Sequence, residues 1–412
     1  MSAFQIMAAL ITLTALFSYL NHRYLKLPST IGVMLIALIA SLTLILFGNL
    51  VPHARSAAEH LLKQVDFDRT LMQGMLCFLL FAGALQIDLG KLLEQKAVVA
   101  ILAVVGVIIS MLIFGVLVHL SLRWLGLDLS YPWCFLFGAL ISPTDPVAIV
   151  GILREAKVPR GLETQIAGES LFNDGIGVVA FIVLSEIVLT GQPATVEHIG
   201  GLFLEEAVGG AAFGFVIGWI AYRLLKSLDD YRVEVMITLS LVMGGYALAG
   251  VIHVSGPIAI VVAGLFIGNH GRRFAMSETT RKNVDAFWGL LDEILNAVLF
   301  VLVGLEILIL TFSKSLFYAG LIGVPALLLA RWVSVWIPVA LMSPWRRFTR
   351  GTVTILTWGG LRGGISVALA LSLPPGRERD IVLATTYVIV IFSILVQGLT
   401  LERVVRRVVP KP

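Results

Sequence analysis

Gly138-Ala-Leu-Ile-Ser-Pro-Thr-Asp-Pro146 places two prolines and a carboxylate inside a long apolar run. Pro143 and Pro146 lack backbone N–H donors and prevent a regular helix from passing through, which frees backbone carbonyls that can ligate a cation. The carboxylate of Asp145 is costly inside an apolar segment unless it has a partner or faces water. This stretch therefore predicts a broken membrane helix with a polar centre.

The rest of the chain has the composition of a membrane protein. Of its 412 residues, 58% are hydrophobic and only 14% are charged, and the mean hydropathy is +0.95. A chain of this length has room for about 13 spans at roughly 30 residues for each span and its loop. High hydrophobicity excludes a disordered chain, and two cysteines are too few for a disulfide scaffold. We expect an all-α polytopic membrane protein that forms one membrane domain over residues 1–412.

Apolar runs between charged residues and Pro or Gly punctuation predict thirteen spans. These spans are 3–21, 28–48, 70–87, 97–122, 131–153, 161–190, 199–222, 233–253, 256–269, 284–308, 315–343, 351–373 and 381–401. Because Arg23 and Lys26 follow the first span, we expect an uncleaved helix, with the N-terminus outside and the C-terminus cytoplasmic. On this topology 21 Lys and Arg residues are cytoplasmic and 7 are outside. The net charge of +4 then reflects cytoplasmic loops, and we expect no nucleic-acid partner.

A few charged residues fall inside the predicted spans. Arg331 and Arg362 are the two basic residues that remain after the loops are counted, and Asp145, Glu169 and Asp174 are deep carboxylates. One negative charge is therefore left over. A carboxylate in a dry interior without a counter-charge has to hold a cation or a proton. The sequence predicts a cation and proton site.

A second interruption lies in the twelfth predicted span. Trp358-Gly-Gly-Leu-Arg-Gly-Gly364 contains four glycines, which favour an unwound backbone. Positions 145 and 361 are 216 residues apart, close to half the chain. Broken helices at matching positions of two halves are typical of inverted-repeat transporters whose site lies between the repeats. The alternative is a simple proline kink and a glycine packing face.

The sixth predicted span contains Gly-Glu-Ser-Leu-Phe-Asn-Asp-Gly, residues 168–175. Positions four apart share a helix face, so Ser170 lies with Asp174, and Glu169 lies with Asn173. Glu169 and Asp174 diverge by about 140°. We therefore expect Asp174 and Ser170 to face the ion path and Glu169 to face a buried arginine.

Together, these motifs resemble the NhaP-type sodium/proton antiporters, prokaryotic members of the monovalent cation:proton antiporter class. The resemblance is carried by residues 142–146, 168–175 and 359–363, and by Asn296, Phe300 and Gly304. It implies a thirteen-helix, NhaA-like fold of two six-helix inverted repeats with crossed broken helices. It also implies a homodimer in the bacterial cytoplasmic membrane.

On this architecture, scaffold and dimerisation helices are expected over 1–90 and 230–308. Core ion-transport helices are expected over 95–190 and 315–403, joined by a linking helix over 199–228.

The resemblance also implies roles for single residues. Asn173 and Asp174 form the paired signature, with Asp174 as the ion-carrying carboxylate. Glu169 is implied to pair with an arginine of the eleventh span, which by position is Arg331, and Arg362 is the competing partner.

We expect Asp174 to hold Na⁺ (or Li⁺) and H⁺ in turn, with Ser170, Thr144 and Asp145 completing an oxygen shell. If Glu169 stays paired, the exchange is one for one and electroneutral. Asn173 agrees with this, because relatives that exchange unequal charges carry aspartate there. Asp145 either ligates the ion or caps the half-helix that follows the break.

Other functions are weighed against this one. A K⁺/H⁺ antiporter on the same scaffold is the main alternative. An intramembrane aspartyl protease with an Asp145–Asp174 dyad is weaker, since the chain lacks a Gly-x-Gly-Asp sequence. We expect a transporter rather than an enzyme, with no cofactor beyond the transported ions. Asp292 and Glu293 mark either a cytoplasmic entrance or, as the favoured interpretation, the interfacial start of a helix.

Overall fold

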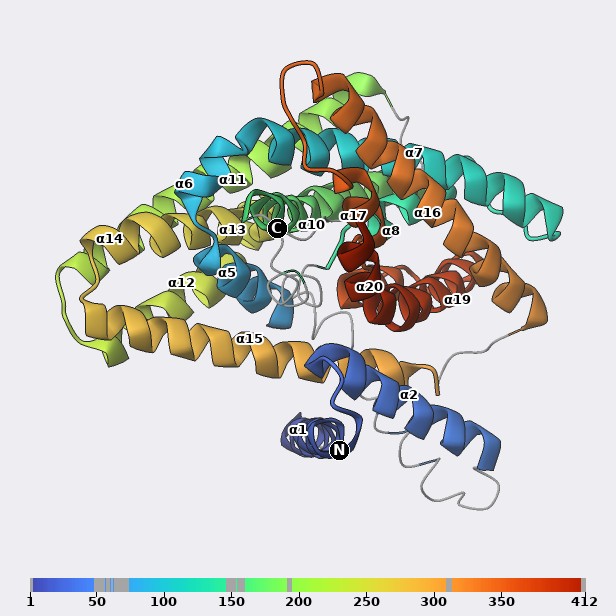
Figure 1. The fold of residues 1–412 in the computed structure, drawn as a ribbon, viewed down its shortest axis with the longest axis horizontal. Coiled ribbons are helices and arrows are strands. Elements are labelled where there is room, and N and C mark those ends of the chain that lie inside the picture. Colours follow the sequence, from blue (N-terminus) through green and yellow to red (C-terminus); the bar gives the residue numbers. More distant parts are fainter. Residues whose placement is uncertain are drawn as a thin grey trace.

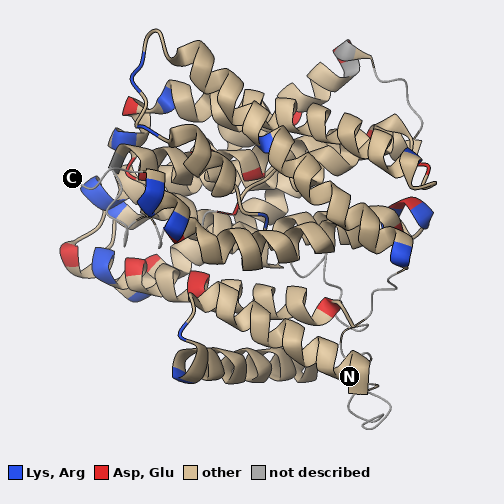
Figure 2. Cartoon of the chain, turned by 45° about the vertical axis from the view of Figure 1, so that its right-hand side comes forward, with Lys and Arg blue, Asp and Glu red and all other residues tan. Residues whose placement is uncertain are grey.

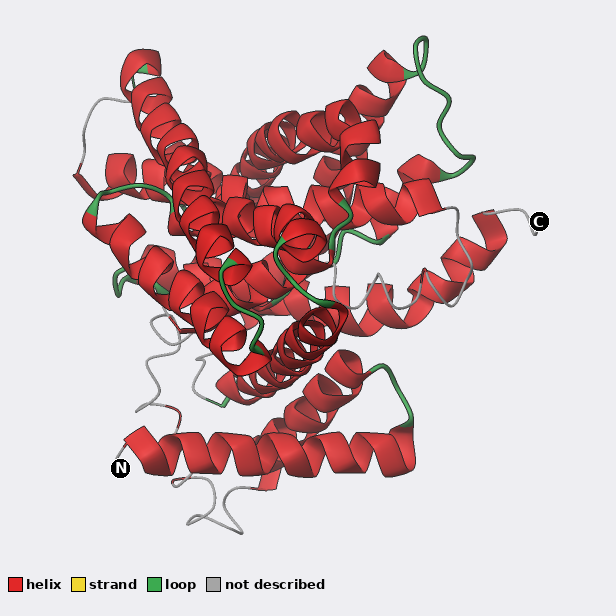
Figure 3. Ribbon diagram, turned by 90° about the vertical axis from the view of Figure 1, so that its left-hand side faces the viewer, coloured by secondary structure: helices red, strands yellow, loops and turns green. Residues whose placement is uncertain are grey.

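The computed structural model describes residues 3–47, 56, 60, 62, 74–145, 153, 160–190, 195–308 and 313–408. Within these ranges every regular element is a helix (Figure 3). Within the predicted span 131–153, residues 146–152 fall outside the described residues.

Long helices that cross one another form most of the molecule (Figure 1). The N-terminal half contains α1 (Ala3–Leu20), α2 (Ser29–Phe47), α5 (Leu76–Gln86), α6 (Leu89–Glu94), α7 (Lys96–Trp124), α8 (Tyr131–Ile141), α10 (Arg160–Thr190) and α11 (Val196–Lys226). The C-terminal half contains α12 (Tyr231–Val251), α13 (Gly256–Phe266), α14 (Arg272–Phe274), α15 (Glu278–Glu306), α16 (Lys314–Met342), α17 (Thr352–Trp358), α18 (Gly364–Leu371), α19 (Arg377–Phe392) and α20 (Leu399–Val408). Short π-helical segments extend α1, α13 and α19.

Nine helical segments of the described residues are long and apolar enough to cross a membrane. They include the whole of α2 and α7 and most of α10, and α5 and α8 are shorter apolar helices. Each of the thirteen predicted spans contains helix, so the prediction of an all-α polytopic membrane protein is confirmed. That all thirteen segments cross the membrane stays a prediction.

Charged residues are concentrated near the ends of the bundle, and only a few lie within it (Figure 2). Several helices begin at polar caps, which satisfy backbone N–H groups that the first turn leaves unpaired. Ser277 accepts a hydrogen bond from Thr280 N at the start of α15, and Ser313 accepts one from Leu316 N at the start of α16. The polar ends and apolar middles fit helices that pass between two aqueous faces.

The helices pack in two groups. The core group contains α7, α8, α10, α16, α17, α18 and α19, with α7 packed against α8, α10 and α16. The scaffold group contains α1, α2, α5, α11, α12, α13 and α15, with α15 packed against α2 and α13 against both α5 and α11. The division into transport core, scaffold and linking helix stays a prediction as a statement about function.

The two predicted breaks contact each other directly. The backbone after α8 is not helical through Asp145, and the backbone between α17 and α18 is not helical from Gly360 to Gly363. Asp145 N donates a hydrogen bond to the Leu361 carbonyl oxygen at 2.8 Å. A Cβ atom at Gly363 would lie 2.5 Å from Asp145 Oδ2, so any other residue there would displace the Asp145 side chain. The two interruptions, far apart in the sequence, form one structural unit.

Candidate functional site

A buried salt bridge joins α10 to α16. Arg331 Nη1 lies 2.5 Å from Glu169 Oε1, and Arg331 Nη2 lies 2.9 Å from Glu169 Oε2. Arg331 Nε also donates to the Leu356 carbonyl oxygen of α17 at 3.2 Å. Both charged residues are at least 95% buried, and the paired geometry is the strong, bidentate form. Of the two arginines left open by the sequence, Arg331 is the partner of Glu169.

Arg362 instead forms hydrogen bonds with the backbone of the first break. Its Nη1 donates to the carbonyl oxygens of Ser142 and Pro143 at 2.7 and 2.9 Å, and its backbone N–H donates to Ser393 Oγ. Two of the carbonyls exposed by the break therefore accept hydrogen bonds from a guanidinium. This corrects the expectation that the carbonyls of the break are generally available to a cation, because a cationic donor already occupies these two.

Asn173 ties α10 to the first break. Its side-chain amide donates to Thr144 Oγ1 at 2.8 Å and accepts from Thr144 N at 3.2 Å. It also approaches Glu169 Oε1 at 3.4 Å. Thr144 Oγ1 and Ser170 Oγ lie 2.9 Å apart, so the predicted ligands Thr144 and Ser170 are hydrogen-bonded to each other. Asn173 thus holds the backbone of the break in position.

Asp174 differs from its neighbours on α10. It is 6% exposed, and its Oδ1 is buried without a hydrogen-bond partner among the described residues. A buried carboxylate oxygen without a donor is costly unless a cation or a proton reaches it. Asp174 also lines a large cavity. It is therefore placed to take a ligand from that cavity.

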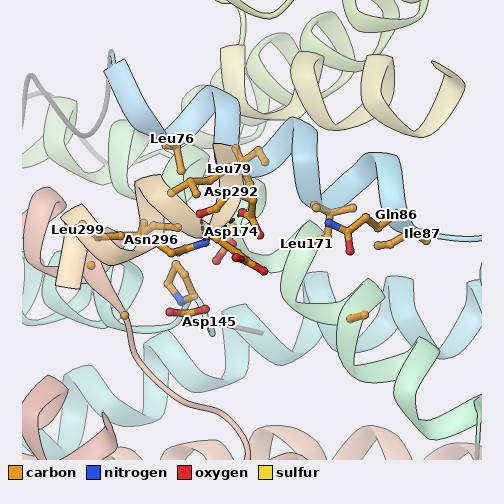
Figure 4. Close-up of a pocket in the computed structure, with 18 of the residues that line it drawn as sticks. Leu76, Leu79, Gln86, Ile87, Asp145, Leu171, Asp174, Asp292, Asn296 and Leu299 are labelled. Atoms are coloured by element: carbon orange, nitrogen blue, oxygen red, sulfur yellow. Dashed lines mark hydrogen bonds between the residues drawn. The ribbon is translucent and has the colours of Figure 1, made fainter. Parts of the chain in front are cut away.

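The cavity has a volume of about 820 Å³ and is lined by two of the predicted site residues, Asp145 and Asp174 (Figure 4). Its charged lining residues, within the described part of the chain, are six acids and one base: Asp88, Asp145, Glu163, Asp174, Asp292, Glu293 and Lys91. This excess of negative charge attracts cations and repels anions. Ser170, Thr144 and Asn173 are buried and do not line the cavity, which differs from the expectation that Ser170 faces the ion path.

Asp88, which caps α6, and Lys91, in the first turn of α6, line the exposed end of the cavity. Their side chains are about half exposed, and Lys91 Nζ lies 3.3 Å from Asp88 Oδ2. Hydrogen bonding from the Lys91 backbone N–H lowers the pKa of Asp88, so Asp88 is ionised at neutral pH. The positive charge of Lys91 is therefore balanced by Asp88 at the mouth of the cavity, away from its deep end.

The favoured interpretation of Asp292 and Glu293 as a helix start is wrong. The helix α15 begins at Glu278, well before them, because Ser277 provides its cap. Both acids instead line the cavity, and Asn296 Nδ2 donates to Asp292 Oδ1 at 3.0 Å. The four-residue spacing of Asp292 and Asn296, which puts them on one helix face, is a signal that could have revealed this pair.

Some partners had no distinctive sequence signal. Ser393, which accepts from the Arg362 backbone, and Leu356, whose carbonyl oxygen accepts from Arg331, are ordinary residues in apolar segments. Asp145 lines the cavity as predicted for a ligand. Its alternative role as a cap concerns residues 146–152, which lie outside the described residues.

Comparisons with known proteins agree with this geometry. The family profile described as "Sodium/hydrogen exchanger, transmembrane" matches residues 10–407. The chain is 48% identical over 408 residues to the Na⁺/H⁺ antiporter NhaP of Pseudomonas aeruginosa, covering 98% of this chain and 96% of that one. It is 36% identical to the Na⁺/H⁺ antiporter NhaH of Halobacillus dabanensis, covering 93% of each chain.

A solved structure shows a similar fold. The sodium proton antiporter MjNhaP1 of Methanocaldococcus jannaschii at pH 8 matches over 100% of both chains, with a TM-score of 0.78 and 18% sequence identity. These relatives are transporters rather than enzymes, which disfavours the protease alternative. The chain belongs to the transmembrane sodium/hydrogen exchanger family.

Proposed function

We propose that the protein exchanges Na⁺, or Li⁺, for H⁺ one for one across the bacterial cytoplasmic membrane, and that Asp174 carries either ion. The observation that carries this proposal is the Asp174 oxygen that has no hydrogen-bond partner among the described residues, in an acidic cavity. The other deep carboxylate of α10, Glu169, already has both oxygens on Arg331. Of these two deep carboxylates, Asp174 is thus the one that remains available to a cation.

The ion reaches Asp174 through the cavity whose mouth is formed by Asp88 and Lys91. On the predicted topology this mouth is cytoplasmic, the N-terminus is outside and the C-terminus is inside. Blue Lys and Arg segments near the C-terminus in Figure 2 favour the same orientation. The cycle requires the core group to move against the scaffold group, and we propose that scaffold helices also join two copies in a homodimer.

Asp174 binds Na⁺ with oxygen ligands that include Asp145, directly or through water. Ser170 and Thr144 act by holding each other and the break, and they join the shell when the cation moves deeper. Asn173 keeps Thr144 in place without adding charge. When Na⁺ leaves, a proton takes its position on the carboxylate. Asp174 therefore carries either Na⁺ or a proton whenever the core group moves.

Exchange is expected to generate no current. With the Glu169–Arg331 pair intact, the Na⁺ form and the protonated form of Asp174 give the core group the same charge. If one net charge moved per cycle, a 100 mV potential would contribute about 2.3 kcal/mol and shift the Na⁺ distribution roughly 45-fold.

The measurement is Na⁺ flux and current together on purified protein in proteoliposomes, with the potential set by K⁺ and valinomycin. Flux independent of potential supports the proposal, and a current that scales with Na⁺ flux contradicts it. Adding Na⁺, Li⁺ and K⁺ in turn, with fluorescence dequenching as the readout, identifies the cations that are exchanged.

The pH profile should depend on the Na⁺ concentration. Protons and Na⁺ compete for Asp174, so activity falls at low pH because protons occupy the site and at high pH because protonation becomes rare. A tenfold rise in Na⁺ displaces protons and should move the acid limb to lower pH by up to about one unit. Initial rates measured from acidic to alkaline pH at two Na⁺ concentrations test this. If the acid limb stays at the same pH at both Na⁺ concentrations, a separate proton sensor is indicated.

A further inference from the structure

Asp292 faces the transport site from the opposite helix group. The predicted ion ligands come from α10 and from the break after α8, which belong to the core group. Asp292 lies on α15, which packs against α1, α2, α5 and α12 in the scaffold group. Because Asp292, Asp145 and Asp174 all line the same cavity, that cavity has carboxylates from both groups.

The carboxylate of Asp292 is held in a defined orientation. Asn296 Nδ2 donates to Asp292 Oδ1 at 3.0 Å and to the Asp292 carbonyl oxygen at 2.9 Å. Asn296 is only 4% exposed, so this amide is fixed by the packing around it. Figure 4 shows the side chains of Asp292, Asn296 and Asp174 gathered at one end of the cavity, with Asp145 nearby. Asp292 is therefore a positioned group, unlike its exposed neighbour Glu293.

The charges around Asp292 leave room for a cation. Asp145 is close enough to act electrostatically on both Asp174 and Asp292. Of the basic side chains in the described part of the chain, only Lys91 lines the cavity, and it pairs with Asp88 at the mouth. Asp174 Oδ1, which is buried and has no hydrogen bond to any residue that the structure describes, indicates a ligand at this same end. Carboxylate oxygens on two sides suit a hard cation.

We propose that Asp292 is a scaffold-side ligand for the transported cation, direct or through one water, which acts only while the cavity is open. The proposal rests on the proposed function of Asp174. Because α15 belongs to the scaffold group, Asp292 stays behind when the core group carries the ion away. Asp292 therefore contributes to Na⁺ affinity only while the site is open to the cavity, which is on the cytoplasmic side in the predicted topology. Asp292 helps to capture Na⁺ there and does not hinder its release on the other side.

The test is the sidedness of Asp292→Asn. In everted membrane vesicles, where added Na⁺ meets the cytoplasmic face, half-maximal exchange should require about fivefold to tenfold more Na⁺ than in the wild type. In right-side-out vesicles the Na⁺ requirement should not change, and the maximal rate should be kept in both. Equal shifts on the two faces, or no shift on either, would overturn the proposal.

Two further variants separate a ligand from a general electrostatic effect. Glu293→Gln removes a charge from the next residue of the same cavity, and its small effect should disappear at high ionic strength. An equal, salt-sensitive effect of both variants would overturn the proposal in favour of a diffuse acidic entrance. Asn296→Ala leaves the Asp292 charge but frees its carboxylate, and should give the same sided shift with smaller size. If Asp292→Asn fails to accumulate, Asn296→Ala carries the same test.

The result can be told apart from a failure of the proposed function. Each of these measurements compares a variant with a wild-type protein that exchanges Na⁺ for H⁺. Absence of exchange in the wild type, or its survival in Asp174→Asn, refutes the proposed function. Exchange that depends on Asp174 and is indifferent to Asp292 refutes only this inference.

Discussion

Asp174→Asn is expected to reduce Na⁺/H⁺ exchange to the background of empty liposomes. Asparagine has nearly the same shape, but it can neither release a proton nor offer a negative charge to Na⁺. The wild-type Oδ1 has no hydrogen bond among the described residues, so the substitution breaks no contact of that atom. The variant should therefore fold, extract and elute as the wild type does.

The measurement is Na⁺ uptake driven by a pH gradient in proteoliposomes. Glu293→Gln is the matched control, because it removes a carboxylate from the same cavity and should keep its maximal rate. Uptake that survives in Asp174→Asn above the background would contradict the central role of Asp174. Thermal unfolding in detergent is recorded in parallel, so that loss of exchange in a folded protein is distinguished from loss of folding.

Arg331→Met is expected to cost about 3–5 kcal/mol of folding free energy. The substitution leaves Glu169 buried at 1% exposure without its cation, and it also removes the donor to the Leu356 carbonyl oxygen. In the double variant Glu169→Gln with Arg331→Met, no uncompensated charge remains. That variant should therefore recover most of the lost stability, and its exchange should remain electroneutral.

Unfolding by heat or denaturant in detergent measures these differences. Lys282→Met is the control, since its ion pair with Glu278 has both side chains largely exposed and should contribute little. A double variant as unstable as Arg331→Met alone would show that the pair acts through its packing or its backbone contact rather than through charge. If the double variant retains exchange, the Glu169–Arg331 pair supports the structure around the site and does not bind the transported ion.

The sequence predicted the helical segments well because membrane helices are long and apolar. It also identified Asp174 and the two breaks, since charges, prolines and glycines inside apolar runs are rare and costly. Helix faces separated Asp174 from Glu169 by direction, and the structure agrees that Glu169 turns to an arginine. These are local features, which periodicity and composition can report.

The remaining features depend on distant contacts. Choosing Arg331 over Arg362 required knowing that Arg362 reaches Ser142 and Pro143, more than two hundred residues away. The predicted span 284–308 already contains Asp292, but α15 begins still earlier, at Glu278, so Asp292 lies well inside the helix rather than at its start. A cap at Ser277 and a polar start can extend a membrane helix far beyond its apolar part. Only the fold shows which face of such an extension meets the cavity.

The close approach at Gly363 has one more consequence. Any side chain at this position would enter the space of Asp145, from which a Cβ atom would be only 2.5 Å away. A residue with no polar side-chain atoms thus sets the location of a carboxylate that comes from the other half of the chain. The volume allowed at position 363 therefore limits where the Asp145 side chain can lie, and the two halves of the molecule meet at a point that tolerates little added bulk.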